Sequence, residues 1–364
     1  MKDPSDPATA RDSAFMRRAL TLARKGWGQT APNPMVGAVV VRADEIAGEG
    51  FHALYGGEHA ETVALRTAGA RARGSTVYVT LEPCAHIGHT PPCADALIAA
   101  GVRRVVAATA DPTPAAAGGG ARLADAGIDF EAGVEGEAAR ELNAAFFHAA
   151  AHDTPFLTLK LAMSLDGAIA DATRTPGWLT GERARREVHR LRGGSDAVAV
   201  GIGTALADNP LLTVRGVRAP RVPPRRVVFD RTARLPLESN LVKSAREVPV
   251  IVVAEHPDSA RGAALRAAGV NLLVVASLDD GLRALRRLGV QSLLVEGGAA
   301  LAGALIARSH VHRLIIFQSP VVLGEGSLPA FGSAPTAAAA GARRLRVIAR
   351  RAFGDDLMTT YAPG

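Results

Sequence analysis

The chain has little cysteine, few aromatic residues and no long apolar run, and each shortage excludes a class of protein. Its 364 residues include only Cys84 and Cys93 as cysteines, so a disulfide-stabilised scaffold is excluded. Aromatic residues make up 4%, too few for the stacking platforms of single-strand nucleic-acid binders. No stretch approaches the roughly 20 consecutive apolar residues of a membrane helix, and the polar stretch Met1–Asp12 lacks the apolar core of a secretory signal. We therefore expect a cytoplasmic protein with no membrane association.

The positive charge is in excess but scattered. The formal net charge is +7, from 42 basic and 35 acidic residues. Arginines supply nearly all of the basic residues and lie singly or in pairs, as in Arg103-Arg104 and Arg286-Arg287. A nucleic-acid-binding surface needs basic residues concentrated on one face or in a run. We therefore expect no nucleic-acid partner.

Helical and strand patterns alternate along the chain, which predicts an α/β protein. In the first half, three helical patterns and three short apolar runs suggest a mainly parallel sheet; the helices are expected over 13–25, 59–68 and 93–100, and the strands over 35–41, 76–81 and 102–108. Composition predicts a loop over 111–120, and a further helix is expected over 135–151.

A domain boundary is expected at His152-Asp153-Thr154-Pro155, which gives domains of residues 1–152 and 153–364. A second alternating series follows this boundary. Its expected strands cover 156–161, 197–200, 226–229, 250–253, 272–275, 292–295 and 314–317. Its expected helices cover 182–191, 260–267, 278–288 and 299–307.

The strongest chemical signal is His59-Ala60-Glu61, followed by Cys84 and Cys93, each of which comes after a proline. One imidazole and two thiolates suit Zn²⁺, and three protein ligands leave a fourth position open for water. Both expected helices begin at these residues, where the helix dipole favours the thiolate form. Glu61 lies two residues after His59 and stays free to carry protons. This order of residues matches the signature of zinc nucleobase deaminases.

The spacing between the two cysteines departs from that signature, because eight residues separate them where two are usual. The longer loop is expected to project into the mouth of the pocket and to offer His86 and His89 to a polar or anionic substituent. A deaminase of bases in RNA or DNA would need the shorter spacing and a concentrated basic surface. A purely structural zinc site would need a fourth protein ligand, and none is obvious.

Longer motifs extend the comparison over both halves. The first half contains Asn33-Pro34-Met35-Val36-Gly37 and the stretch LEPCAHIGHTPPC at 81–93; the second contains KLAMSLDG at 160–167, WLTG at 178–181, GIGT at 201–204, LADNP at 206–210 and VEGG at 295–298. Over about residues 12–330 the chain closely resembles the bifunctional deaminase/reductases of riboflavin biosynthesis. The resemblance implies a cytidine-deaminase-like N-terminal domain and a dihydrofolate-reductase-like C-terminal domain.

The resemblance also implies the chemistry. A zinc-dependent deaminase would hydrolyse the 2-amino group of 2,5-diamino-6-ribosylamino-4(3H)-pyrimidinone 5′-phosphate, with Glu61 as the proton carrier. An NADPH-dependent reductase would then convert the ribosyl group to ribityl, giving 5-amino-6-ribitylaminouracil 5′-phosphate. The partner is thus a phosphorylated pyrimidine, and a homo-oligomer stays open.

Site residues follow from the resemblance position by position. The deaminase substrate would meet Asn33, His86 and His89. NADPH would meet Ala162, Trp178, Thr204, Asp208, Gly297 and Gly298. The reductase substrate would meet Arg192, Leu212, Arg215 and Glu296, with Arg192 and Arg215 able to fork onto its phosphate.

Three positions depart from the family pattern. His89 stands where Arg or Lys is usual, Pro176 where a polar residue is usual, and Arg231 where a small residue is common. A neutral imidazole at His89 would weaken a phosphate contact.

Overall fold

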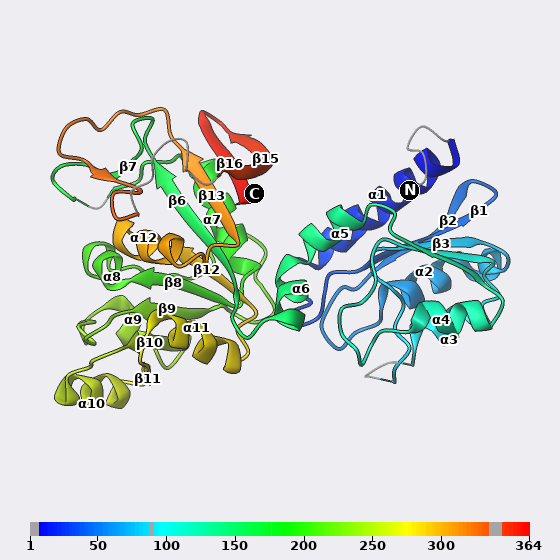
Figure 1. The fold of residues 1–364 in the computed structure, drawn as a ribbon, viewed down its shortest axis with the longest axis horizontal. Coiled ribbons are helices and arrows are strands. Elements are labelled where there is room, and N and C mark those ends of the chain that lie inside the picture. The colour runs from blue at the N-terminus through cyan, green and yellow to red at the C-terminus, as the bar shows by residue number, and fades with distance from the viewer. Residues whose placement is uncertain (1–6, 88–90, 176, 335–343) are drawn as a thin grey trace. The chain divides into compact units, whose positions relative to one another are not determined.

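Apolar strands and intervening helices build two α/β units in the computed structural model (Figure 1). The structure describes residues 7–87, 91–175, 177–334 and 344–364. The chain divides into Met1–His152 and Asp153–Gly364, each with its own sheet and core. Among the residues described, no helix combines the length and the apolar character that crossing a membrane requires.

The first unit is built on a five-stranded sheet with the order β2-β1-β3-β4-β5. The strands are β1 (Gly37–Arg42), β2 (Glu45–Phe51), β3 (Thr76–Val79), β4 (Arg104–Ala107) and β5 (Asp129–Ala132). β1 pairs antiparallel with both β2 and β3, whereas β3, β4 and β5 are parallel. The carboxyl ends of β3 and β4 therefore lie side by side at one edge, where α/β sheets place their ligands.

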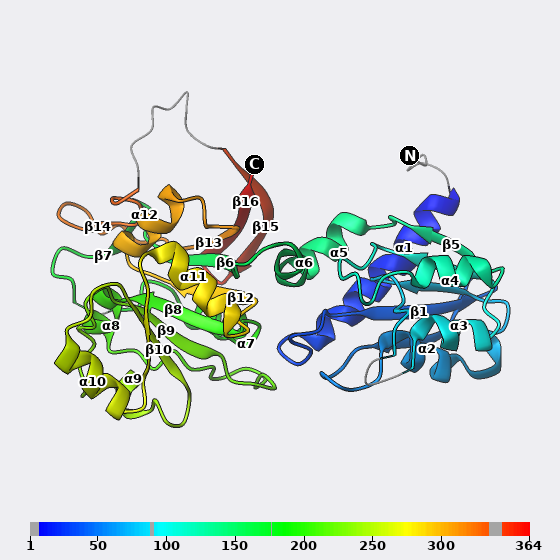
Figure 2. The same cartoon turned by 60° about the horizontal axis from the view of Figure 1, so that its bottom comes forward.

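Helices cover both faces of this sheet (Figure 2). They are α1 (Pro7–Ala23), α2 (Ala60–Ala68), α3 (Cys93–Ala99), α4 (Gly119–Asp125), α5 (Gly136–Leu142) and α6 (Ala144–Ala151), with 3-10 turns at Arg24–Gly26 and Gly69–Ala72. Side chains alternate along β1, so Ala38 and Val40 face α2, α3 and α4, while Val39 and Val41 face α1 and α5. This alternation buries β1 on both faces.

Close packing of α2 on β2 depends on glycine. A Cβ atom at Gly50 would lie 2.3 Å from the Ala60 carbonyl oxygen, and one at Gly48 would lie 2.3 Å from that of Ala64. Any larger residue would push the helix away from the sheet. The two glycines thereby fix the start of α2, which carries His59 as its N-cap and Glu61 in its first turn.

The second unit contains a nine-stranded sheet with the order β11-β10-β9-β8-β12-β6-β13-β16-β15. Its strands are β6 (Phe156–Met163), β8 (Ala197–Gly201), β9 (Arg225–Phe229), β10 (Val250–Ala254), β11 (Asn271–Val274), β12 (Ser292–Glu296), β13 (Arg313–Gln318), β15 (Leu345–Phe353) and β16 (Asp356–Pro363). The strands from β11 to β13 in this order are parallel, and β16 and β15 add an antiparallel hairpin. A short pair, β7 (Ala168–Ala170) and β14 (Leu328–Pro329), stands apart.

Helices sandwich this sheet as well. They are α7 (Glu182–Gly193), α8 (Ile202–Asp208), α9 (Asn240–Lys243), α10 (Ser259–Ala267), α11 (Leu278–Arg287) and α12 (Ala299–Ala307). Side chains of α11 and α12 pack in one core with β6, β8 and β12, and those of α9 and α10 pack in a second core with β8, β9 and β10. β8 leads directly into α8, and only Gly297 and Gly298 separate β12 from α12.

The α/β class expected from the sequence is confirmed, and several elements need correction. The helix expected over 135–151 is two helices, separated at Asn143, whose side chain accepts a hydrogen bond from the Met35 backbone N–H and donates one to its carbonyl. The first sheet is mixed rather than mainly parallel, because β2 is a strand that the sequence did not suggest. The loop expected over 111–120 ends earlier, since α4 begins at Gly119.

Candidate active sites

His59, Cys84 and Cys93 converge in the first unit. Their ligand atoms all lie within 4.8 Å of one another. The Nδ1 atom of His59 lies 3.1 Å from the Sγ atom of Cys93 and 3.6 Å from that of Cys84. His59 caps α2, Cys93 begins α3 and Cys84 follows β3, so three separate elements supply the three donors.

The chemistry of this donor set fits zinc. The pKa of Cys84 is lowered to about 4, chiefly by a hydrogen bond from Cys93 and further by His59. The backbone N–H of Cys93 also donates to the Cys84 sulfur, at 3.3 Å. Thiolate is the form that ligates a metal, and one His with two Cys leaves a tetrahedral position open. Among the described residues, this is the cluster of soft donors close enough to hold an ion.

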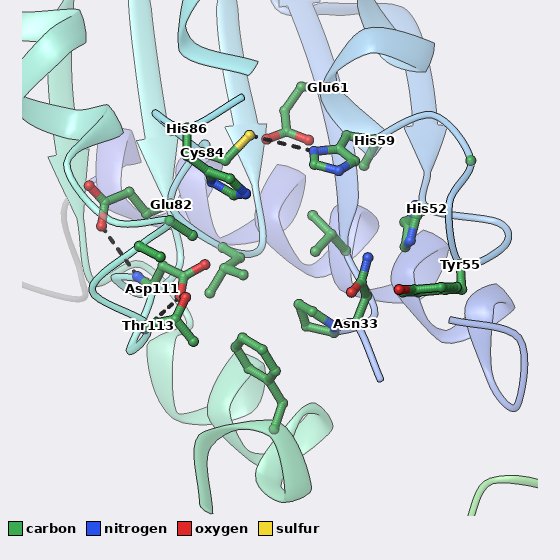
Figure 3. A pocket seen from close by; sticks show the side chains of 18 of the residues that line it. Asn33, His52, Tyr55, His59, Glu61, Glu82, Cys84, His86, Asp111 and Thr113 are labelled. Atoms are coloured by element: carbon green, nitrogen blue, oxygen red, sulfur yellow. Dashed lines mark hydrogen bonds between the residues drawn. The ribbon is translucent and has the colours of Figure 1, made fainter. Parts of the chain in front are cut away.

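Glu61 lies beside the three donors without being one of them. Its side chain is 4% exposed and lines the same cavity as His59 and Cys84 (Figure 3). Burial raises the pKa of this carboxyl, while His59 acts against that rise. A buried carboxyl with a raised pKa exchanges protons near neutral pH more readily than an exposed one.

The cavity has a volume of about 340 Å³ and is lined by more residues than the sequence suggested. Asn33 and His86, both expected, line it; His89 lies outside the described residues. The additional polar lining residues are His52, Tyr55, Glu82, Asp111 and Thr113 (Figure 3). Phe146 of α6 adds an apolar side chain.

Two signals could have pointed to these additional residues. Asp111 follows β4 just as Cys84 follows β3, and polar residues after parallel strands collect at one edge of the sheet. The second signal is the short spacing of seven positions from His52 to His59. His52 lies in the turn between β2 and α2, with its Nδ1 atom 3.0 Å from the Glu58 carbonyl oxygen. Its buried Nε2 atom has no hydrogen-bond partner within the described parts of the chain. Neither signal identifies Glu82.

In the second unit, Arg192 and Glu296 meet directly. Arg192 donates to Glu296 through Nε at 2.5 Å and through Nη2 at 2.8 Å, and the two side chains are only 10% and 12% exposed. Lys160 on β6 is the register partner of Glu296 on β12, and its charge also lowers the pKa of Glu296 against the effect of burial. In this structure the Arg192 guanidinium thus has Glu296 as its partner, and its expected fork onto a phosphate stays a prediction.

The loop that carries Leu212 and Arg215 is tied to α7. Arg192 donates from Nη1 to the Thr213 carbonyl at 3.0 Å, and His189 Nδ1 accepts from the Arg215 backbone N–H at 3.2 Å. Leu212 has a φ of 54° and a buried side chain that packs in the core, so only its backbone is available to a ligand. The Arg215 side chain is exposed.

The expected dinucleotide positions come together only in part. Thr204 in α8 faces the loop after β12, since a Cβ atom at Gly298 would lie 3.1 Å from its Oγ1 atom. Asp208 ends α8 and interacts electrostatically with Lys160. Ala162 lies near the end of β6, and Gly297 and Gly298 join β12 to α12.

Trp178 stands out as an exposed aromatic side chain. It is 75% exposed, and the Arg185 guanidinium lies 5.3 Å from the centre of its ring. Of the unusual positions, Pro176 lies outside the described residues. Arg231 is an exposed residue that pairs with Glu255 at 3.0 Å. Arg231 therefore has a partner of its own on the surface.

The fold and the donor set of the first unit define a class of protein. A three-ligand zinc-type site with an adjacent buried Glu defines a deaminase of the cytidine-deaminase type. The family model described as "Cytidine and deoxycytidylate deaminase zinc-binding region" matches residues 9–109, and the one described as "RibD C-terminal domain" matches residues 155–359. The second unit thus has the dihydrofolate-reductase-like reductase fold.

The chain belongs to the RibD family, the bifunctional deaminase/reductases of riboflavin biosynthesis. It is 41% identical to the riboflavin biosynthesis protein RibD of Aquifex aeolicus, over 86% of this chain and 88% of that protein. It is 41% identical to RibD of Escherichia coli, over 86% of this chain and 89% of that protein.

Solved structures agree over nearly the whole length. Acinetobacter baumannii RibD, form 1, superposes with a TM-score of 0.85 at 36% identity, covering 98% of this chain and 99% of that one. The diaminohydroxyphosphoribosylaminopyrimidine deaminase/5-amino-6-(5-phosphoribosylamino)uracil reductase of Thermotoga maritima gives a TM-score of 0.85 at 33% identity, covering 98% and 100%. The chain is therefore an enzyme with a deaminase unit and a reductase unit.

Proposed function

We propose that the first unit hydrolyses the 2-amino group of 2,5-diamino-6-ribosylamino-4(3H)-pyrimidinone 5′-phosphate. Water adds to the ring carbon that bears the amino group, and ammonia leaves. His59, Cys84 and Cys93 would hold a zinc ion, which would supply Lewis-acid activation of that water. The observation that carries the proposal is the buried Glu61 carboxyl in the same cavity as the three donors.

Glu61 does the proton transfer in this proposal. Its carboxylate takes a proton from the attacking water and passes it to the ring nitrogen and then to the leaving amine. Asn33 and His86 line the cavity and supply hydrogen-bonding groups to the substrate. The cavity volume of about 340 Å³ is enough for a pyrimidine with part of its substituent.

For the second unit, we propose reduction of the deaminated product by NADPH. NADPH would supply a hydride to C1′ of the ribosylamino group; the C1′–O4′ bond breaks as the ring opens, and O4′ takes a proton, which completes the ribityl chain. Glu296, held by Arg192, faces the substrate, and the exposed Arg215 binds its phosphate. Ala162, Trp178, Thr204, Asp208 and the Gly297-Gly298 turn form the dinucleotide side, where backbone N–H groups at the start of α12 meet phosphate.

The test supplies each reaction with its own substrate. The purified chain is given the diaminopyrimidinone phosphate, and ammonia release is followed without NADPH. It is then given the aminouracil with NADPH, and loss of nicotinamide absorbance is followed. Ammonia release that survives in verified metal-free protein, or no NADPH oxidation with the aminouracil, would contradict the respective half of the proposal.

A further inference from the structure

One wall of the deaminase cavity is a tight turn after β4. Asp111, Thr113, Ala115 and Ala116 all line the cavity. The Thr113 backbone N–H donates to the Asp111 carboxylate at 2.8 Å, and the Ala116 N–H donates to the Thr113 carbonyl at 3.0 Å. We call residues 111–116 the cavity wall. These internal bonds shape the wall but do not attach it to the zinc ligands.

The attachment comes from Glu82, two residues before Cys84. Its carboxylate accepts three backbone hydrogen bonds: from Asp111 at 3.2 Å, from Gly118 at 3.2 Å and from Gly120 at 2.9 Å (Figure 3 shows the first). Asp111 is the first residue of the cavity wall, and Gly118 and Gly120 follow the wall, so a single side chain holds both of its ends. An ionised carboxylate is a stronger acceptor for such N–H groups than a neutral oxygen.

Neighbouring contacts tie the same segment to the loop after β3 that carries Cys84. A Cβ atom at Gly119 would lie 1.7 Å from the Pro83 carbonyl oxygen, so only glycine allows this approach. The Ala85 N–H donates to the Ala116 carbonyl at 3.2 Å. Residues 82, 83 and 85 make these contacts, and they lie on both sides of Cys84 in the sequence.

We propose that Glu82 is a positioning residue of the deaminase site. Its carboxylate fixes the cavity wall relative to Cys84, so that the part of the substrate that does not react is held with its amino-bearing carbon beside Glu61. This inference rests on the proposed deamination. In this proposal, Glu82 affects the position of the substrate through the cavity wall. It neither binds the metal nor transfers a proton.

The variant Glu82→Gln tests the proposal with little change in shape. The amide replaces one acceptor oxygen with an N–H group, which then faces a backbone donor. Glu45→Gln is the matched control, because Glu45 is an exposed residue of the same unit and the charge change is the same. We expect KM for deamination to rise about tenfold or more in Glu82→Gln, with kcat within about twofold, and no change in the control. Zinc content stays that of the unaltered chain.

Hydrogen–deuterium exchange supplies a readout that does not depend on turnover. Amides of the peptide 109–122 should exchange faster in Glu82→Gln, while those of α2 keep their protection. If Glu82→Gln does not fold, Glu82→Asp is measured in the same way; it keeps the charge with a shorter reach, and a smaller rise of KM is expected.

Several results would overturn the inference. These are unchanged exchange over 109–122, a loss of kcat at constant KM, or a loss of zinc from folded protein. If the unaltered chain releases no ammonia, the proposed deamination fails, and the exchange experiment still decides whether Glu82 fixes the wall.

Discussion

Replacing Glu296 by glutamine perturbs a buried ion pair of the reductase unit. Removing one partner of a buried pair costs about 3–5 kcal/mol, because the other charge is left uncompensated. Glu296 compensates two cations, Arg192 through two hydrogen bonds and Lys160 across the β12–β6 register. We therefore expect Glu296→Gln to cost about 4–5 kcal/mol, at the upper end of that range.

Removing the cation of this pair instead should lower the free energy of unfolding by less. Arg192→Met leaves Glu296 with Lys160 as its partner, so we expect about 3 kcal/mol. In a domain of this size, 1 kcal/mol shifts the melting temperature by about 2–4 °C, which gives a drop of about 8–20 °C for Glu296→Gln. Adding Lys160→Met to Glu296→Gln should recover part of the loss, since it removes one orphaned cation.

Differential scanning calorimetry of the whole chain measures these shifts. A zinc chelator identifies the transition of the first unit, which serves as an internal control and should not move in the Glu296 variant. If Arg192→Met proves as costly as Glu296→Gln, or if Lys160→Met recovers nothing, then Glu296 does not compensate both cations and the reasoning is refuted.

Three further predictions concern the first unit. Purified protein should carry about one zinc per chain by elemental analysis, and Cys84→Ser should lose both the metal and ammonia release. Glu61→Gln should keep its zinc and lose deamination at least about a hundredfold, while NADPH oxidation with the aminouracil stays unchanged; equal loss of both reactions would contradict two separate sites. Burial acts against ionisation of Asp12, but hydrogen bonds from Arg104 and Tyr78 outweigh it and hold the pKa of Asp12 below its usual value. Its stabilising contribution is thus present above about pH 4 and lost as the pH falls through the lowered pKa, so urea unfolding of Asp12→Asn should show a smaller loss of stability on acidification.

The central strands could be predicted from the sequence because they are buried on both faces. Runs such as those in β1, β8 and β10 are continuously apolar, and burial of both faces demands that pattern. One edge strand, β11, keeps the short apolar stretch Leu272-Leu273-Val274 and could be predicted. The other edge strands, β2, β5 and β15, carry no such run, since each is partly exposed and contains polar or charged residues. Their strand conformation comes from pairing with a neighbour, which a local pattern does not encode.

The sequence by itself determined the zinc donors and Glu61, because ligand chemistry restricts the residue types and the short His-Ala-Glu and Pro-Cys motifs keep them recognisable. Only the tertiary structure decided what surrounds them. Glu82 and Asp111 are 29 positions apart and meet because β3 and β4 are parallel neighbours whose following loops share one edge of the sheet. Likewise, Arg192 pairs with Glu296, 104 positions further along the chain, since a buried carboxylate needs a cation as its partner. Such partners depend on which strands lie side by side, and that is a property of the folded chain.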